Sequence, residues 1–252
     1  MALGMALVWR DTRDGVSYEV RNQGRTMRLY ANDVQHSEFH PQRLVTGSVW
    51  DLLWLPGFFL EKKAPLRVLV LGLGGGSLVP PIRALFDPID FHAVELDELH
   101  LYVARRFFAV EDFAVECHCA NAVDFVQSWD GEPFDLVIED LFAPSDRTVS
   151  RAVNATGRWF GSLSKLVAPG GVLVMNFGDW AEYKRSWCGG EGAMRGWSNR
   201  FRFSTPDCHN AVMVWTRDAV ETSGLRFQLH EHPKLNAELE SGRLNYRAIK
   251  LD

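Results

Sequence analysis

Short apolar runs alternate with longer amphipathic stretches through the middle of the chain, from about residue 67 to residue 176. The runs are short enough to be strands buried on both faces, and they lie at 68–71, 91–94, 114–119, 134–138 and 172–176. The stretches between them predict helices, including one over 98–108 and a long one over about 148–167. This alternation predicts a mainly parallel α/β sheet with right-handed crossovers and helices on both faces.

Strand patterns of a different kind flank this region. Residues 16–20 and 26–30 alternate polar and apolar side chains around Asn22-Gln-Gly24, a good hairpin turn. Residues 201–203 and 211–215 are predicted strands that pair antiparallel at the end of the sheet, because a turn-like segment joins them. We therefore expect an N-terminal β-hairpin appendage, a Rossmann-like domain and a polar tail packed loosely on or near it, over residues 1–45, 46–220 and 221–252.

A glycine-rich turn follows the first central strand. It contains Gly72, Gly74, Gly75 and Gly76. We expect Ser77 to cap the next helix, with Pro80-Pro81 in its first turn. The second strand ends in Glu95-Leu96-Asp97. Glycine lets the backbone approach a nucleoside closely, and an acid at this strand end suits a ribose diol, so the pattern predicts a nucleoside-type cofactor. The alternative is a tight turn used only for packing.

Two later strands also end in polar residues, Asn121 after the third and Asp140 after the fourth. Ligands bind at the carboxyl ends of parallel strands, so these side chains belong to the same predicted site. Dinucleotide-binding turns usually read G-x-G-x-x-G, whereas the sixth position here is Ser77. The antiparallel final pair favours a sheet of the S-adenosylmethionine-binding type instead.

Composition narrows the class of protein. A net charge of −5 over 252 residues argues against a nucleic-acid surface. The four cysteines predict free thiols in a reducing compartment. Residues 1–9 are apolar but lack a basic leader, so we expect a cytoplasmic protein without a membrane span. We also expect a small-molecule substrate and no nucleic-acid partner. Nine tryptophans are mostly core, although some could form a homodimer surface.

Histidines raise the question of a metal. His36, Glu38 and His40 share one face if that segment is extended, but the spacing is not a helical zinc pattern and no third ligand is evident. We expect a polar strand edge near the mouth of the site and no metal. The segment His230-Glu-His232 is interpreted in the same way.

From Arg67 to Asn176 the chain resembles the spermidine synthase family, which shares the class I methyltransferase fold. The segment Val94-Glu-Leu-Asp-Glu98 looks like that family's acidic strand end, and Asn121-Ala122 stands where the family usually has Asp-Ala beside the adenine. Asp140 stands at the family's catalytic aspartate, and Gln35 follows a strand like its N-terminal β element. The resemblance implies that Glu95 holds the ribose, that Gln35 borders the substrate and that the cofactor contacts Gly72, Gly74, Gly75, Glu95, Leu96, Asn121, Ala122, Asp140 and Leu141.

The chain departs from the family at two acids. The glycine-loop aspartate that faces the aminopropyl ammonium is replaced by Gly75, and the second acid after the catalytic one by Ala143. Leu141 and Phe142 make the rim apolar. Free N–H groups of residues 75–77 at a helix N-terminus would favour a carboxylate, which S-adenosylmethionine keeps and its decarboxylated form lacks.

Three functions follow from these patterns. The favoured hypothesis is a transferase that moves an alkyl group, most simply methyl, from S-adenosylmethionine to a small-molecule nucleophile. Asp140 would orient the acceptor and take its proton, while Glu139 faces away. The second is aminopropyl transfer from decarboxylated S-adenosylmethionine, with Glu38 or Asp179 replacing the missing acids. The third is a non-catalytic nucleoside-binding or interaction protein.

Overall fold

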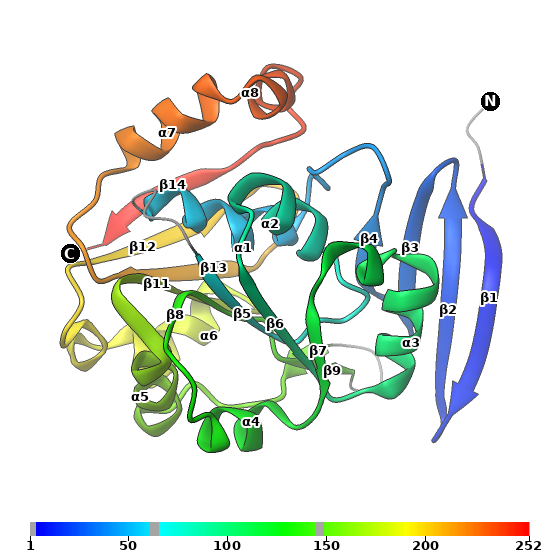
Figure 1. Ribbon diagram of the computed structural model, residues 1–252, viewed down its shortest axis with the longest axis horizontal. Coiled ribbons are helices and arrows are strands. Elements are labelled where there is room, and N and C mark those ends of the chain that lie inside the picture. Colours follow the sequence, from blue (N-terminus) through cyan, green and yellow to red (C-terminus); the bar gives the residue numbers. More distant parts are fainter. Residues whose placement is uncertain (1–3, 61–65, 145–148, 252) are drawn as a thin grey trace.

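The computed structural model describes residues 4–60, 66–144 and 149–251, which contain two large sheets and one two-stranded sheet (Figure 1). The N-terminal sheet is antiparallel and comprises β1 (Ala6–Arg13), β2 (Val16–Gln23), β3 (Thr26–Ala31) and β4 (Val34–Phe39). The central sheet has eight strands in the order β14-β12-β13-β11-β8-β5-β6-β7. Its strands are β5 (Arg67–Leu71), β6 (Asp90–Glu95), β7 (Glu116–Cys119), β8 (Phe134–Glu139), β11 (Val167–Phe177), β12 (Asn199–Ser204), β13 (Ala211–Thr216) and β14 (Arg247–Leu251).

The strands from β11 to β7 are parallel, whereas β13, β12 and β14 each pair antiparallel with a neighbour. This confirms the predicted mainly parallel sheet with an antiparallel end. The N-terminal appendage is larger than one hairpin, because β1 and β4 flank the predicted pair. Each strand connection over the parallel part carries a helix, as parallel pairing requires.

Helices cover both faces of the central sheet (Figure 1). They are α1 (Val49–Trp54), α2 (Val79–Phe86), α3 (Glu98–Phe107), α4 (Ala122–Ser128), α5 (Gly157–Leu166), α6 (Trp180–Arg185), α7 (Thr222–Glu231) and α8 (Pro233–Glu240). Along β5 the side chains alternate between two cores: Val68 and Val70 pack with α1, α2 and α7, and Leu69 and Leu71 with α4 and α5. All four are fully buried, which explains the unbroken apolar run.

The N-terminal sheet packs against the end of the central sheet where the strands finish. The Tyr18 hydroxyl donates to Asp97 at 2.5 Å, and the backbone N–H of Glu38 donates to the Ser77 hydroxyl at 2.8 Å. The prediction that Ser77 caps the next helix is therefore wrong. Helix α2 begins two residues later at Val79, with Leu78 as the N-cap residue and without a side-chain cap.

The predicted helix over 148–167 is wrong in its first half. Thr148 lies outside the described residues, and Val149–Arg151 form strand β10, which pairs antiparallel with β9 (Phe142–Pro144). Helix α5 begins only after Thr156, whose hydroxyl accepts from the N–H of Trp159 at 3.2 Å. The β9–β10 hairpin lies beside the ends of the parallel strands.

The C-terminal tail is not loosely packed, contrary to expectation. Its helices α7 and α8 bury Leu225, Leu229 and Leu235 in the core, and β14 forms the edge of the central sheet beside β12. Leu225 and Leu229 are four residues apart on α7, which is the ordinary spacing of a buried helical stripe, and Leu235 lies on α8. Residues 187–194 form two 3₁₀ turns, η3 (Trp187–Gly189) and η4 (Glu191–Met194).

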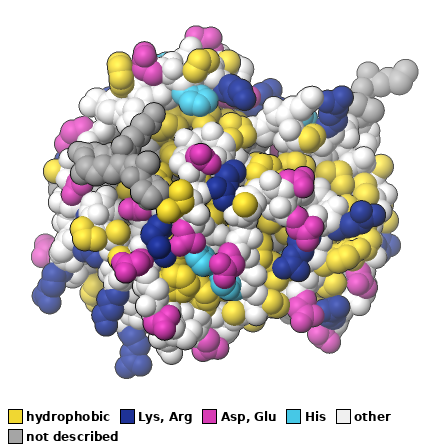
Figure 2. All heavy atoms as spheres, in the orientation of Figure 1, with side chains coloured by type: hydrophobic (Ala, Val, Ile, Leu, Met, Phe, Trp, Pro, Cys, Tyr) yellow, Lys and Arg dark blue, Asp and Glu magenta, His cyan; other side chains and the backbone are white. Residues whose placement is uncertain are grey.

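Acidic and basic side chains are interspersed over the face shown in Figure 2, consistent with the small net charge. Apolar side chains are also exposed on β1, where Leu7 and Val8 are 51% and 43% accessible. Among the described residues, no helix is both long and apolar enough to cross a bilayer.

Candidate functional site

A cavity of about 550 Å³ opens at the carboxyl ends of β5, β6 and β8, between the central sheet and β4. Its volume is in the usual range for a small-molecule site. The site residues predicted from the sequence line it, with one exception, Gly75. Those that do are Gln35, Gly72, Gly74, Glu95, Leu96, Asn121, Ala122, Asp140 and Leu141.

Gly72 fixes the floor of this cavity. Its φ of +89° lies in the left-handed region, and a Cβ there would collide with the carbonyl oxygen of Asp140. The N–H of Gly72 donates to the carbonyl of Val94 at 2.9 Å, and that of Asp140 donates to the carbonyl of Leu71 at 2.8 Å. The ends of β5, β6 and β8 are therefore held together at a position that only glycine fits.

Gly75 lies behind the cavity wall. Its N–H donates to the Ser37 hydroxyl at 2.6 Å, and an added Cβ would approach the Ser37 Cβ to 2.9 Å. The N–H of Gly76 donates to the carbonyl of Leu73 at 2.9 Å. The prediction that free N–H groups here receive a carboxylate is therefore wrong for Gly75 and Gly76, because the N–H groups of both glycines already have protein partners.

Glu95 lies in the cavity wall and is 9% exposed. One carboxylate oxygen accepts from the N–H of Gly74 at 2.7 Å and the other from the N–H of Asp97 at 2.9 Å. Burial alone would raise the pKa of Glu95, but His100, at 3.7 Å, and the backbone donors outweigh it and lower the pKa. Each oxygen keeps a lone pair, so an oriented carboxylate remains available to a ligand.

Two histidines complete this wall, and their rings lie 5.2 Å apart. Burial lowers the pKa of His36 to about 4, whereas Glu95 overcomes the effect of burial at His100 and raises its pKa. In both, Nε2 is buried without a hydrogen-bond partner among the described residues. From the sequence we expected His36 to lie at a polar strand edge near the mouth of the site. No feature of the sequence identified His100 as a site residue.

The face predicted for His36, Glu38 and His40 does not form one cluster. Glu38 accepts from Arg28 at 2.7 Å, and His40 follows the end of β4 and accepts from the N–H of Gln42 at 3.1 Å. Only His36 reaches the cavity.

On the opposite side, Asp140 is held by a chain of amides. Asn210 donates to Asn176 at 3.0 Å, and Asn176 donates to the Asp140 carboxylate at 2.8 Å. Burial raises the pKa of Asp140 to about 6, against the opposing effects of Asn176 and Arg151. Both asparagines line the cavity. Asn176 follows the rule that identified Asp140, because it also lies near the carboxyl end of a parallel strand.

Glu139 points away from the cavity, as expected, and is fully buried. It pairs with Arg151 and accepts from the indole N–H of Trp159 at 3.2 Å. Arg151 also donates to the carbonyl of Val153 at 3.2 Å and lies over the ring of Phe177 at 4.7 Å. This arginine, which the sequence did not single out, fixes the β9–β10 hairpin beside the site.

Asn121 and Ala122 line the far wall. The Asn121 side-chain oxygen accepts from the N–H of Val123 at 2.8 Å, which makes Asn121 the N-cap of α4. That hydrogen bond fixes the amide at the cavity edge, with its NH₂ group and one oxygen lone pair left for a ligand.

No family model matches the chain, but individual known proteins are similar to it in sequence. The eEF1A lysine and N-terminal methyltransferase of Mus musculus is 34% identical over 106 residues, covering 40% of this chain and 15% of that protein. The polyamine aminopropyltransferase of Vibrio vulnificus is 26% identical over 125 residues, covering 48% of this chain and 40% of that protein. The chain thus spans less than half the length of these relatives.

Solved structures agree with this result. A probable spermidine synthase from Corynebacterium glutamicum superposes with a TM-score of 0.71 at 17% identity, covering 89% of this chain and 86% of that chain. Human methyltransferase-like protein 13, in complex with SAH, superposes with a TM-score of 0.59 at 18% identity, covering 76% and 92%.

The chain therefore has a spermidine synthase-like fold, which solved structures of S-adenosylmethionine-dependent transferases share. It is also a distant sequence relative of both aminopropyltransferases and eEF1A methyltransferases.

Proposed function

We propose that this protein binds S-adenosylmethionine and transfers an alkyl group, most simply methyl, to a small-molecule nucleophile. The observation that carries the proposal is the gathering of Glu95, Asn121 and Asp140 around one cavity at the ends of neighbouring parallel strands. Relatives that include methyltransferases and aminopropyltransferases support the same chemistry.

The cavity residues fit the cofactor. Glu95 offers one acceptor position on each oxygen to the ribose hydroxyls, and Asn121 offers donor and acceptor positions to the adenine edge. The Nε2 atoms of His36 and His100 are buried polar positions that a ligand hydroxyl or carboxylate can satisfy after a small adjustment. Bound S-adenosylmethionine would supply the electrophilic carbon.

The chain's own contribution to the reaction is alignment and proton transfer. Transfer from a sulfonium depends mainly on holding donor and nucleophile in line. With its pKa near 6, Asp140 is mostly deprotonated at pH 7 and can accept the proton of an amine or hydroxyl acceptor. Its hydrogen bond from Asn176 keeps one carboxylate oxygen fixed and leaves the other for the acceptor.

The structure favours methyl over aminopropyl transfer, the second candidate. Ser37 fills the space beside Gly75, so that position cannot carry the family's aspartate without moving β4. Ala143 lines the cavity where the second acid would stand. Glu38 and Asp179 do not replace these acids, because Glu38 pairs with Arg28 and Asp179 caps α6. Each missing charged hydrogen bond to a polyamine would forfeit about 1.5–3 kcal/mol.

Titration calorimetry with three ligands tests the proposal. Binding of S-adenosylmethionine in preference to its decarboxylated form supports methyl transfer, and the reverse preference supports aminopropyl transfer. The third ligand is methylthioadenosine. If the protein binds none of the three ligands, only the non-catalytic alternative remains.

The catalytic part of the proposal needs a second experiment. Production of S-adenosylhomocysteine is measured against a panel of amine, hydroxyl, thiol and peptide-amine acceptors. An Asp140→Asn variant should retain cofactor affinity and lose turnover with an amine or hydroxyl acceptor. Normal turnover by that variant would remove Asp140 from the mechanism.

A further inference from the structure

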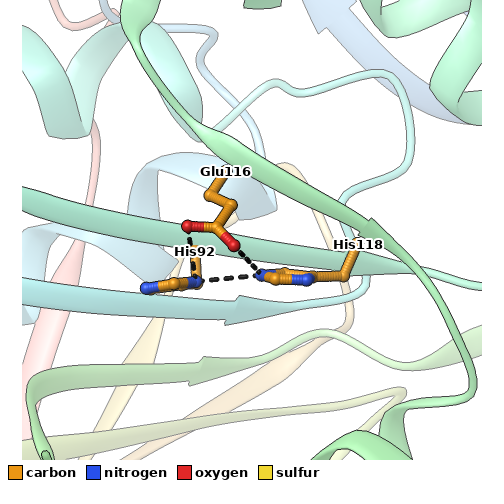
Figure 3. A group of neighbouring side chains, drawn as sticks. All are labelled: His92, Glu116 and His118. Atoms are coloured by element: carbon orange, nitrogen blue, oxygen red, sulfur yellow. Dashed lines mark hydrogen bonds and ion pairs between the residues drawn. The ribbon is translucent and has the colours of Figure 1, made fainter. Parts of the chain in front are cut away.

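A second cluster of ligand-type side chains lies outside the cavity, on the edge of the central sheet. His92 comes from β6, and Glu116 and His118 come from the neighbouring edge strand β7 (Figure 3). In the parallel register His92 is paired with Glu116, and His118 is two residues further along β7. Because side chains alternate along a strand, all three project from the same face of the sheet.

The three side chains converge on one point. Nδ1 of His92 and Nε2 of His118 are 2.9 Å apart. The two oxygens of Glu116 lie 3.7 Å from His92 Nδ1 and 3.6 Å from His118 Nε2. Figure 3 shows the rings end to end, with these nitrogens facing each other and the carboxylate turned toward both. A carboxylate and two imidazole nitrogens thus face a common centre, with all ligand atoms within 4.8 Å of one another.

We propose that His92, Glu116 and His118 bind a divalent transition-metal ion of the zinc class. Two imidazole nitrogens and one carboxylate oxygen are a typical three-ligand set for zinc, whereas Mg²⁺ and Ca²⁺ prefer oxygen ligands throughout. Glu116 is exposed, with 66% of its side chain accessible, so the fourth position faces solvent. A water molecule can occupy that position.

The surroundings of His92 are those of a metal ligand. Its Nε2 lies 2.7 Å from a carboxylate oxygen of Asp90, which also pairs with Arg67 at 2.8 Å. The bond to Asp90 places the ring proton on Nε2 and leaves the Nδ1 lone pair directed at the site. A carboxylate behind a ligating histidine is the usual arrangement in zinc sites.

Aromatic side chains hold both rings from the protein side. The ring of His92 packs edge-on against Trp129 at 4.9 Å and against Phe134 at 5.6 Å. The ring of His118 lies 4.8 Å from Phe125 of α4. These contacts restrict the rings to small movements, so the convergent geometry is built into the core packing.

A metal fits after a small adjustment. Two nitrogens that bind one tetrahedral zinc at its ordinary bond lengths are about 3.3 Å apart. The present separation of 2.9 Å is that of a hydrogen bond, and with the His92 proton on Nε2 toward Asp90 the donor in this bond is His118. The metal would replace that shared proton, and the nitrogens would separate by about 0.4 Å.

The ion would join the edge strand β7 to β6. Two residues after His118, Ala120 donates its N–H to the carbonyl of Glu95 at 3.0 Å and lines the cavity. The metal would therefore stabilise a wall of the nucleoside cavity without contacting Asp140. Its effect should be greatest on the stability of the fold.

Zinc affinity is measured on protein purified in metal-free buffer, by competition with a chromogenic chelator. The wild-type protein should bind one Zn²⁺, and Co²⁺ should give the visible absorption of a four-coordinate site. Glu116→Gln and His118→Gln should abolish binding, and Asp90→Asn should weaken it about 10- to 100-fold. Glu116 is exposed, so its replacement should leave the fold intact.

His230→Gln, at an exposed histidine of α7, is the matched control and should bind zinc as the wild type does. Zinc should also raise the melting temperature of the wild type and of this control, but not that of Glu116→Gln. Failure of the wild type to bind Zn²⁺ or Co²⁺ would overturn the proposal. Unchanged affinity in Glu116→Gln would also overturn it. So would loss of affinity on replacing by serine Cys119, the exposed free thiol that follows His118 on β7, because the ligand set would then be a different one.

Discussion

The affinity for S-adenosylhomocysteine depends on Glu95 if the cavity is an adenosine site. Glu95→Gln keeps the size of the side chain, removes its charge and replaces one acceptor oxygen by an NH₂ group. The carboxylate has one acceptor position free on each oxygen, and a hydrogen bond to a charged group contributes about 1.5–3 kcal/mol. Losing one such bond to the ribose should weaken binding about 10- to 150-fold.

The same substitution has a second effect that must be separated from binding. In the variant, the N–H of Gly74 or of Asp97 faces an NH₂ group, and a buried unpaired N–H costs about 1–3 kcal/mol. Titration calorimetry should therefore be run well below the melting temperature, with circular dichroism confirming the fold. Glu98→Gln is the matched control, because Glu98 is three residues away and 75% of its side chain is exposed. Equal affinity in the wild type and Glu95→Gln, or equal losses in Glu95→Gln and Glu98→Gln, would show that Glu95 does not bind the ribose.

Three further predictions concern the proposed general base Asp140, the buried ion pair and the tail. The pKa of Asp140 is raised to about 6, so kcat/KM should fall as the pH drops below about 6 and the base is protonated. Asn176→Ala removes a hydrogen bond that lowers the pKa of Asp140, so the pH at which kcat/KM falls should rise by about 1–2 units. A pH profile identical to that of the wild type would contradict this prediction. Arg151→Leu leaves Glu139 buried without its counter-charge and should lower the free energy of unfolding in urea by about 3–5 kcal/mol. Leu229→Ala should cost about 2–5 kcal/mol in the same assay, whereas a loosely attached tail would show no change.

The central sheet could be predicted because its signal is local. Runs such as Val68–Leu71 bury both faces, and the helices between them fix the parallel order. The prediction that a helix begins at residue 148 was wrong because contacts distant in the sequence decide the structure there. Arg151 is held in a strand by its pairing with Glu139 and its contact with Phe177, and neither partner is near it in sequence. The prediction of a loosely packed tail was wrong for a different reason. Its few buried leucines lie on helices whose other residues are mostly polar.

The part of the site that the sequence predicted rests largely on one rule, that ligands bind at the carboxyl ends of parallel strands. Polar residues at the carboxyl ends of parallel strands identified Glu95, Asn121 and Asp140, and the same rule applied to Asn176 would have added it. The contact between Ser37 and Gly75 depends on how the N-terminal sheet docks, and this also blocks the N–H group expected to bind a carboxylate. Contacts between separate layers of the fold leave no pattern in a single sequence.

A crystal structure of the protein with S-adenosylhomocysteine would show whether the cavity is an adenosine site. We expect the ribose hydroxyls within hydrogen-bond distance of Glu95, the adenine beside Asn121 and the sulfur facing Asp140. Crystals grown at saturating ligand that show an empty cavity, or a ligand whose ribose is turned away from Glu95, would rule out the proposed adenosine site.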